Sequence, residues 1–404
     1  MRCTRLRAIA QTMMLDRLSP QAPDALLALI RLHDADPRDD KIDLGVGVYR
    51  TEDGNTPVFA AVKAAEQRLV QEQDSKSYLG PEGDMGFVNA LMPHIFGADP
   101  TMGGRISGMQ TPGGTGAVRL ALALAQKAGV KRVHMGVPSW PNHAQILADL
   151  GLELVPFDHA SPDGTANLEA VLDAIVNAGV EDAVLLHGCC HNPTGIDYTA
   201  DQWEQIAEAL AQSGTFPIID SAYQGLGQGL EADAAGLRSV LAKVPEAFIA
   251  YSCDKNFGQY RDRVGAFYIL GQDSKALETA FSNANALARA CWSMPPDHGG
   301  AVVRLILRDP ELTAMWMAEL DDMRGRMRGV RDALAAAGSA GRIDLTPLGT
   351  QNGLFAMLPV TKEEVAQLRE GHGIYMAASG RINIAGLTMG NLPKFIAALA
   401  AVAH

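Results

Sequence analysis

The side chains best suited to chemistry lie in one stretch, residues 251–265, which contains Lys255 and, eight residues later, Arg263. An amine condenses with an aldehyde only when it is neutral, so a covalent lysine needs nearby positive charge or poor solvation to lower its pKa. A short apolar strand, expected at residues 247–251 and followed by Ser252, Lys255 and Arg263, would supply both. This stretch alone leaves open the alternative that Lys255 is an ordinary loop lysine.

Polar residues follow three expected strands, at the point where each strand ends. The apolar runs 183–186, 216–219 and 247–251 alternate with helical patterns, which is typical of a parallel sheet covered by helices on both faces. Ligands bind beyond the carboxyl ends of such strands. We therefore predict an α/β fold with a site that Asn192, Asp220, Tyr223 and Lys255 share.

A glycine-rich turn at residues 110–117 leads into a run rich in Ala and Leu that has high helix propensity. The free backbone N–H groups at such a helix start, together with the helix dipole, favour a phosphate. The turn is neither a Walker loop nor a dinucleotide fingerprint, because the residues that define those motifs are not there. Gly114 and Thr115 are the expected phosphate contacts.

Trp140 lies in the string Pro-Ser-Trp-Pro-Asn-His, residues 138–143. Each proline fixes its own backbone angle and restricts the residue before it, so this tryptophan is held rigidly. A rigid indole suits a stacking platform, and the alternative is a core tryptophan.

The segment His187, Cys189, Cys190, His191 resembles a metal site at first sight. Adjacent side chains point to opposite faces of an extended chain, so these four are not expected to converge on one ion, and we predict no metal. The five cysteines show no Cys-x-x-Cys spacing, which indicates neither zinc nor a disulfide framework and favours a reducing compartment.

Composition narrows the class of protein further. The 404 residues are 47% hydrophobic and 20% charged, which is ordinary for a globular protein, and the net charge of -12 argues against a nucleic-acid partner. No apolar run reaches about 18 residues, so no membrane partner is expected. The basic first dozen residues suggest a transit peptide or, as we prefer, a true start at Met13 or Met14.

The motif Ser-x-x-Lys-Asn-Phe-Gly at residues 252–258, followed by Arg-x-Arg-Val-Gly at 261–265, resembles the cofactor-lysine segment of the class I pyridoxal-phosphate aminotransferases of the aspartate and aromatic amino acid group. The other segments quoted above resemble the same family, and the likeness extends from about Ala22 to the end. The resemblance implies fold type I, a mostly parallel central sheet with helices on both faces plus a smaller α/β domain. It also implies pyridoxal 5'-phosphate as the cofactor, bound as a Schiff base to Lys255.

The resemblance assigns roles to individual residues. Lys255, Asp220 and Tyr223 would take part in the chemistry, with Asp220 facing the ring nitrogen and His143 and His187 supporting it from behind. Trp140 would lie on the ring, while Asn192 and Tyr223 would bind its hydroxyl. The phosphate contacts would be Gly114, Thr115, Ser252, Arg263 and, from the other subunit of a homodimer with shared active sites, Tyr78. Substrate contacts would be Gly47, Trp140, Asn192, Arg289 and Arg381, with Arg381 on the α-carboxylate and Arg289 on a distal carboxylate across the dimer interface.

Asp254 departs from the family pattern, which usually has a small residue directly before the lysine. A carboxylate there would repel a phosphate unless Arg261 or Arg263 offsets its charge.

Domain organisation is expected as an N-terminal extension at 1–14, an arm at 15–48 that joins the small domain, a large cofactor domain at 49–320 and a small domain at 321–404. Helices are expected at residues 22–33, 56–73 and 312–337, the last ending at Gly338 and crossing between the domains. Residues 42–49 are expected to be extended.

The function expected is a cytoplasmic transaminase that moves the amino group of an aromatic or acidic L-amino acid to 2-oxoglutarate. Arg289 favours dicarboxylates, whereas the neighbouring Cys291, Trp292 and Met294 are less polar than in strict aspartate enzymes and would admit an aromatic side chain. The alternatives are a strict aspartate aminotransferase, a related pyridoxal-phosphate lyase or decarboxylase, and a non-catalytic binding protein.

Overall fold

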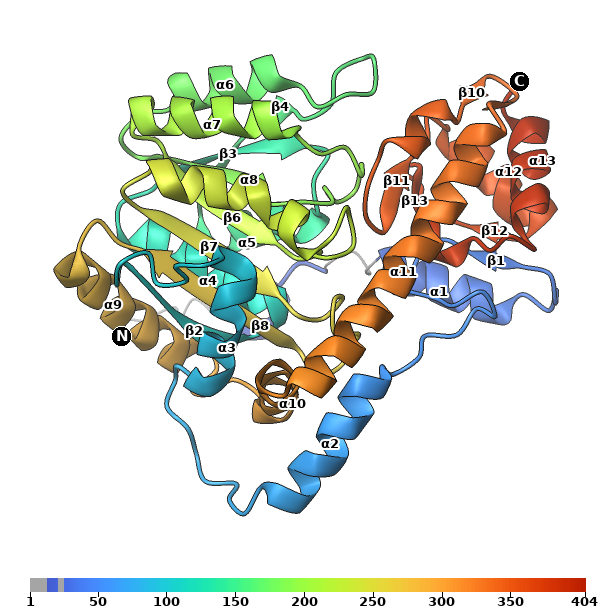
Figure 1. Cartoon of the computed structure of the whole chain (residues 1–404). Helices are drawn as coiled ribbons and strands as arrows, with labels where there is room; N and C mark the ends of the chain where they lie inside the picture. Colours follow the sequence, from blue (N-terminus) through green and yellow to red (C-terminus); the bar gives the residue numbers. More distant parts are fainter. Residues whose placement is uncertain (1–12, 21–24) are drawn as a thin grey trace, which may run out of the picture.

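The computed structural model describes residues 13–20 and 25–404, so most of the predicted extension at 1–14 lies outside the described residues. A seven-stranded sheet in the order β2-β8-β7-β6-β5-β3-β4 forms the centre (Figure 1). β8 runs antiparallel to β2 and β7, and the other pairs are parallel, which confirms the predicted mostly parallel α/β sheet. In sheet order the strands are β2 (Ile106–Pro112), β8 (Val264–Leu270), β7 (Ala247–Ser252), β6 (Phe216–Ser221), β5 (Asp182–His187), β3 (Arg132–Val137) and β4 (Glu153–Asp158).

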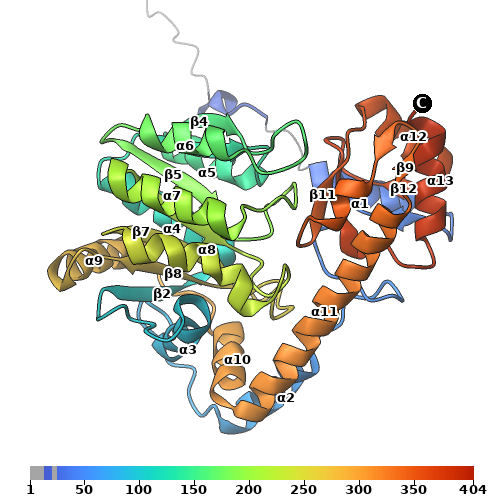
Figure 2. The ribbon, with the colours of Figure 1, turned by 45° about the horizontal axis from the view of Figure 1, so that its top comes forward.

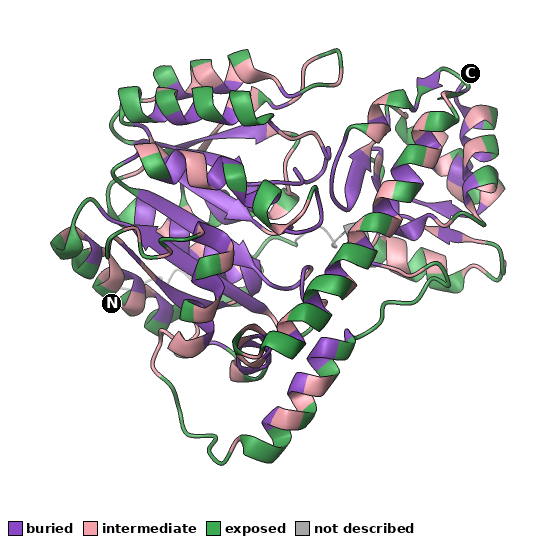
Figure 3. Cartoon of the chain, viewed as in Figure 1, coloured by how far each residue is buried: buried purple, intermediate pink, exposed green. Residues whose placement is uncertain are grey.

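Both faces of the sheet are covered, so its central strands are buried from end to end. In β7, Phe248 and Ala250 join the core on one face, while Ala247, Ile249 and Tyr251 join the core on the other. Figure 3 shows these strands buried between helices that are exposed on their outer sides. One face carries α4 (Gly113–Lys127), α5 (Pro141–Leu150) and α9 (Ser274–Cys291), and the other carries α3 (Met85–Phe96), α6 (Leu168–Val176), α7 (Ala200–Ser213) and α8 (Leu230–Lys243).

The long helix α11 (Pro310–Ala336) leads from the sheet region to a smaller C-terminal part of the chain (Figures 1 and 2). It confirms the helix predicted at 312–337. In the smaller part, β1 (Ile42–Asp43) pairs in parallel with β12 (Ile374–Tyr375), which brings early and late residues of the chain together. The remaining elements are η1 (Met14–Arg17), α1 (Ala25–Ala35), α2 (Ala60–Glu72), α10 (Asp297–Arg308), β9 (Ser339–Ala340), β10 (Ile343–Asp344), η2 (Thr346–Gly349), β11 (Phe355–Met357), α12 (Lys362–His372), β13 (Arg381–Asn383), η3 (Ile384–Gly386) and α13 (Leu392–Val402).

Two elements differ from the sequence prediction. Residues 42–49, which are expected to be extended, form a strand only at Ile42–Asp43, because the Asp43 side chain accepts the N–H of Gly45 at 2.9 Å and turns the chain. The helix expected at 56–73 begins only at Ala60, because Phe59 has a non-helical ψ of 144° and the Glu319 carboxylate accepts the N–H groups of Ala60 and Ala61. Among the described helices, none is long and apolar enough to cross a membrane.

Candidate active site

A cavity lies at the carboxyl ends of β5, β6 and β7, where the sequence places the polar residues. The same end of the sheet receives the start of α4 and the segment before α5, so residues far apart in the chain meet there. The lining residues are Gly114, Thr115, Trp140, His187, Asn192, Asp220, Ala222, Tyr223, Ser252, Asp254 and Lys255. The structure thus brings together most of the predicted site and adds Ala222 and Asp254.

A larger cavity of about 380 Å³ lies elsewhere, between Phe96, Met102 and Leu241. Its two arginines, Arg105 and Arg238, already donate to backbone carbonyl groups. None of the predicted site residues lines this larger cavity. The candidate site is therefore distinguished by the reactive side chains that line it, and not by its volume.

Lys255 follows β7 directly and its amine faces the cavity. Its Nζ lies 5.3 Å from the centre of the Tyr223 ring and makes no hydrogen bond to any residue that the structure describes. Burial lowers the pKa of Lys255, and the positive charge of Arg263 lowers it further, while the carboxylates of Asp254 and Asp220 oppose the shift. The pKa of Lys255 is thus shifted in the direction that covalent chemistry by an amine requires.

Asp220, at the end of β6, accepts a hydrogen bond from His143 Nε2 at 2.9 Å. Burial by itself would raise the pKa of Asp220, but the bond from His143 and the positive charges nearby hold it below its ordinary value. Asp220 is therefore an ionised carboxylate in a nearly closed environment.

Ser139 connects the two histidines that support Asp220. Its Oγ lies 3.0 Å from His143 Nδ1 and 3.1 Å from His187 Nε2. The Ser139 hydroxyl therefore links the two imidazole rings behind Asp220. The sequence prediction gave Ser139 no role, although its place in the rigid string before His143 was a usable signal.

Asn192, which follows β5, and Tyr223, which follows β6, contact each other at the same edge of the sheet. Asn192 Nδ2 donates to the Tyr223 hydroxyl at 3.2 Å, and Asn192 Oδ1 is buried without a partner among the described residues. Burial raises the pKa of Tyr223 above its ordinary value, so the hydroxyl stays protonated. Asp197 holds the turn before Asn192, because its carboxylate accepts the N–H groups of Cys190 and His191 at 3.0 and 2.9 Å.

The predicted phosphate contacts gather at the first turn of α4. Gly114 lies so close to β7 that a Cβ added to it would be 2.8 Å from Ser252 Cβ. Thr115 and Ser252 line the same cavity, and Arg263 reaches this turn from the start of β8. A helix start with hydroxyl groups and a guanidinium group is a suitable anion site.

Trp140 is the residue before α5, and its ring packs edge-on against His143 with ring centres 5.0 Å apart. Trp140 also lines the cavity, where an indole suits a stacking platform.

Arg381 approaches the site from the smaller part of the chain. Its guanidinium group lies 4.6 Å from the centre of the Phe355 ring, which in turn is 6.3 Å from the Tyr223 ring. Nη2 donates to the Gly45 carbonyl at 3.0 Å, and Nε is buried without a partner among the described residues. Gly47 packs against the far edge of Phe355. Phe355 carried no sequence signal, because nothing in its local pattern separates it from a core residue.

Tyr78 and Arg289 lie outside the cavity of their own chain. The Tyr78 side chain is 95% exposed, and Arg289, near the end of α9, is exposed and donates to Ser293 Oγ at 2.7 Å. Their predicted roles across a dimer interface therefore stay predictions.

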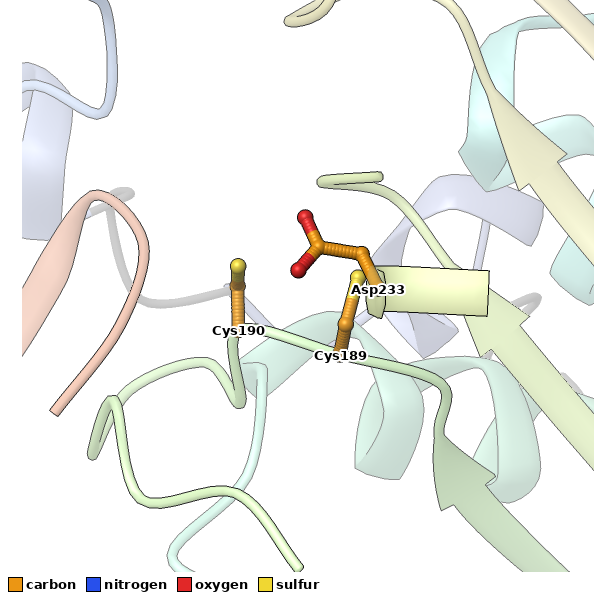
Figure 4. A group of neighbouring side chains, drawn as sticks. All are labelled: Cys189, Cys190 and Asp233. Atoms are coloured by element: carbon orange, nitrogen blue, oxygen red, sulfur yellow. The ribbon is translucent and has the colours of Figure 1, made fainter. Parts of the chain in front are cut away.

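Cys189, Cys190 and Asp233 form a buried group whose possible ligand atoms all lie within 4.8 Å of one another (Figure 4). The expected divergence of adjacent side chains is wrong for the two cysteines, because Cys190 has a φ of 50° and the chain is not extended there. The Asp233 oxygens already accept the N–H groups of Gly225, Gly227 and Gln228. The hydrogen bond between the two thiols lowers the pKa of Cys189 and raises the pKa of Cys190, and with burial and the neighbouring carboxylates the pKa of both thiols is raised. This set stabilises the 225–228 loop and is poorly suited to a metal ion, which requires thiolates.

Comparison with known proteins identifies close relatives over nearly the whole chain. The family described as aminotransferase class I and II matches residues 39–399. A tyrosine aminotransferase of Rhizobium meliloti (strain 1021) is 49% identical over 93% of this chain and 96% of its own, and an aspartate aminotransferase of Escherichia coli (strain K12) is 41% identical over 96% of this chain and 100% of its own. The crystal structure of an aromatic-amino-acid aminotransferase of Burkholderia pseudomallei, covalently bound to pyridoxal phosphate, superposes with a TM-score of 0.92 at 34% identity and covers 97% of this chain and 100% of its own.

Proposed function

Because the chain belongs to the family of class I and II aminotransferases, we propose that it moves the amino group of an aromatic or acidic L-amino acid to 2-oxoglutarate. Its cofactor is pyridoxal 5'-phosphate. The observation that carries this proposal is the arrangement of Lys255 and Asp220: a buried amine with a lowered pKa, beside an ionised carboxylate held by His143. The names of the relatives support both aromatic and acidic substrates.

The described residues fit pyridoxal phosphate. Asn192 Oδ1 is a buried polar atom without a partner, in a cavity that also presents the Tyr223 hydroxyl. The start of α4 offers free N–H groups for a phosphate, and Asp220 offers a carboxylate for a protonated ring nitrogen. We propose that Gly114, Thr115, Ser252 and Arg263 hold the phosphate, while Trp140, Asn192, Asp220 and Tyr223 hold the ring.

When bound, pyridoxal phosphate supplies an aldehyde for the amine and a ring that accepts the electron pair left on the substrate carbon. Lys255 Nζ then has two tasks: it binds the cofactor at rest, and as a neutral amine it takes the proton from the substrate Cα. Its lowered pKa serves both tasks, because a protonated ammonium group could perform neither.

Asp220 keeps a proton on the ring nitrogen, and this requires a carboxylate that stays ionised in a dry site. The hydrogen bond that His143 donates to Asp220 favours the charged form, and Ser139 Oγ links His143 to His187 behind it. Because Tyr223 stays protonated, its hydroxyl would donate a hydrogen bond to the ring hydroxyl of the cofactor while it accepts one from Asn192.

Arg381 binds the α-carboxylate that every amino acid substrate carries. Its free Nε–H group and the planar fork of its guanidinium suit a carboxylate that accepts two hydrogen bonds. The contact with Phe355 holds the group between the two parts of the chain.

The visible absorption of the purified protein tests this function. Conversion of the cofactor band by both L-phenylalanine and L-aspartate, without any oxo acid, is expected. Conversion by aspartate alone would identify a strict aspartate aminotransferase, which is the second candidate because of the E. coli relative. Release of carbon dioxide or ammonia, with no amine transfer, would indicate a decarboxylase or lyase. A protein with no cofactor band after cofactor is added would be a non-catalytic relative.

We also propose a cytoplasmic homodimer with shared active sites. The exposure of Tyr78 and Arg289, and their position outside their own cavity, supports a second copy of the chain that receives them. The free cysteines Cys189, Cys190, Cys253 and Cys291 support a reducing compartment. Sedimentation of the protein tests the dimer, and cell fractionation tests the location.

A further inference from the structure

Asp254, the residue before Lys255, forms an ion pair inside the proposed phosphate site. One carboxylate oxygen accepts a hydrogen bond from Arg263 Nη1, and the other accepts the Val264 N–H at 3.0 Å. The Asp254 side chain is 3% exposed, whereas that of Arg263 is 41% exposed. The carboxylate is therefore a fixed partner that also lines the proposed cofactor cavity, and the arginine is the more exposed member of the pair.

Gly113 at the start of α4 leaves the space that this ion pair fills. A Cβ added to Gly113 would lie 2.6 Å from Arg263 Nη2 and 3.1 Å from an Asp254 oxygen, and the residue has a φ of 70°. The guanidinium group therefore lies directly on the backbone of the helix start. A side chain at 113 would collide with the guanidinium group, so this position requires glycine.

Arg263 shares its positive charge with Asp254 through Nη1, while its Nε and Nη2 groups donate to no residue that the structure describes. Its Nη1 also donates to the Tyr260 carbonyl at 3.1 Å, so that nitrogen is fully used within the protein. Val264 anchors the carboxylate through its backbone, and Asp254 cannot move away when an anion arrives. An incoming phosphate must share Arg263 with a buried negative charge on the same side.

We propose that Asp254 limits the affinity of this site for the cofactor's phosphate group, because it binds Arg263 itself and places a carboxylate beside the phosphate. This inference rests on the proposed function. The remaining phosphate contacts are the helix start, Thr115 and Ser252. The inference predicts that bound cofactor exchanges with free cofactor more readily than these contacts alone would suggest. Burial and the nearby positive charges act in opposite directions on the pKa of Asp254, and burial prevails, so the pKa is raised.

The test compares two ligands that differ only in the phosphate. Cofactor is removed from the purified full-length protein, and the dissociation constants of pyridoxal phosphate and of pyridoxal are measured by absorbance titration. Asp254→Asn keeps an oxygen for the Val264 N–H and removes the charge, and Asp254→Ser with a thermal melt provides a second variant. Asp262→Asn is the matched control, since it removes a charge from the same loop at a residue that makes no ion pair with Arg263.

For Asp254→Asn we expect the Kd for pyridoxal phosphate to fall by roughly tenfold and the Kd for pyridoxal to change by less than about twofold. Asp262→Asn should bind both ligands as the unsubstituted protein does. An unchanged or higher Kd for pyridoxal phosphate in both Asp254 variants, or an equal change for both ligands, overturns the inference. If the unsubstituted protein forms no cofactor band with either ligand, the proposed function itself fails. That outcome differs from failure of the inference alone, in which the unsubstituted protein still forms the band.

Discussion

Replacement of Arg381 is the sharpest test of how the two parts of the chain cooperate at the site. Arg381 opens β13, yet its guanidinium group lies over Phe355 and close to Tyr223 of the sheet region. Nη2 is held by the Gly45 carbonyl at 3.0 Å, and Nε has no partner within the described residues. The group is thus oriented by the protein and keeps N–H donors for a substrate.

The magnitude follows from the hydrogen bonds that each variant removes. Arg381→Lys keeps the positive charge but loses the planar fork, and one lost charge-assisted bond costs about 1.5–3 kcal/mol, which is a loss of roughly ten- to a hundredfold in kcat/KM. Arg381→Ala removes the charge as well, and we expect a loss of about two to three powers of ten.

The assay is kcat/KM for L-phenylalanine and for L-aspartate, measured with the same oxo acid. Both substrates carry an α-carboxylate, so both values should fall by the same factor. Asn383, in the same strand, binds the carbonyl groups of Val46 and Val48, and Asn383→Ser serves as a control for loosening of this region. A loss confined to aspartate would place Arg381 on the distal carboxylate and refute its assigned role.

Three further predictions follow from the same contacts. Lys255→Ala should reduce transamination by more than about a thousandfold while cofactor still binds noncovalently, as titration would show, and an active variant would remove Lys255 from the mechanism. If Arg289 serves the partner's site, hybrid dimers of Lys255→Ala and Arg289→Ala protomers should regain activity on aspartate that neither homodimer has; hybrids without activity would place Arg289 at its own site. Burial by itself would raise the pKa of Asp182, but hydrogen bonds from Arg132 at 2.7 and 2.9 Å outweigh it and lower the pKa from 3.8 to about 2. The contribution of ionised Asp182 to stability is therefore present above pH 4 and lost toward pH 2. Asp182→Asn should lower the free energy of unfolding by about 2 kcal/mol at neutral pH and by much less at pH 2.5. A loss of stability that does not depend on pH would contradict this prediction.

Local sequence patterns were sufficient for the elements that position the site. Apolar runs with a polar residue directly after them predicted β5, β6 and β7 and their shared edge, because parallel strands must place their carboxyl ends together. The boundaries of β1 and α2 were wrong, since a side chain of Asp43 ends one element and the distant Glu319 caps the other. Such contacts leave no trace in a local pattern.

The order of residues along the chain predicted which groups would gather: Lys255 after one strand, Asp220 and Asn192 after neighbouring strands, and a glycine-rich helix start. Spacing is enough for this prediction, because parallel strands place their carboxyl ends at one edge of the sheet, whereas the roles of the residues came from the family resemblance. The direct contacts between side chains are visible only in the folded protein. It joined Ser139 to both histidines, set Phe355 under Arg381 and paired Asp254 with Arg263 across the start of α4. Those contacts depend on side chains from separate elements meeting within a few ångströms, and that distance is a property of the packed fold.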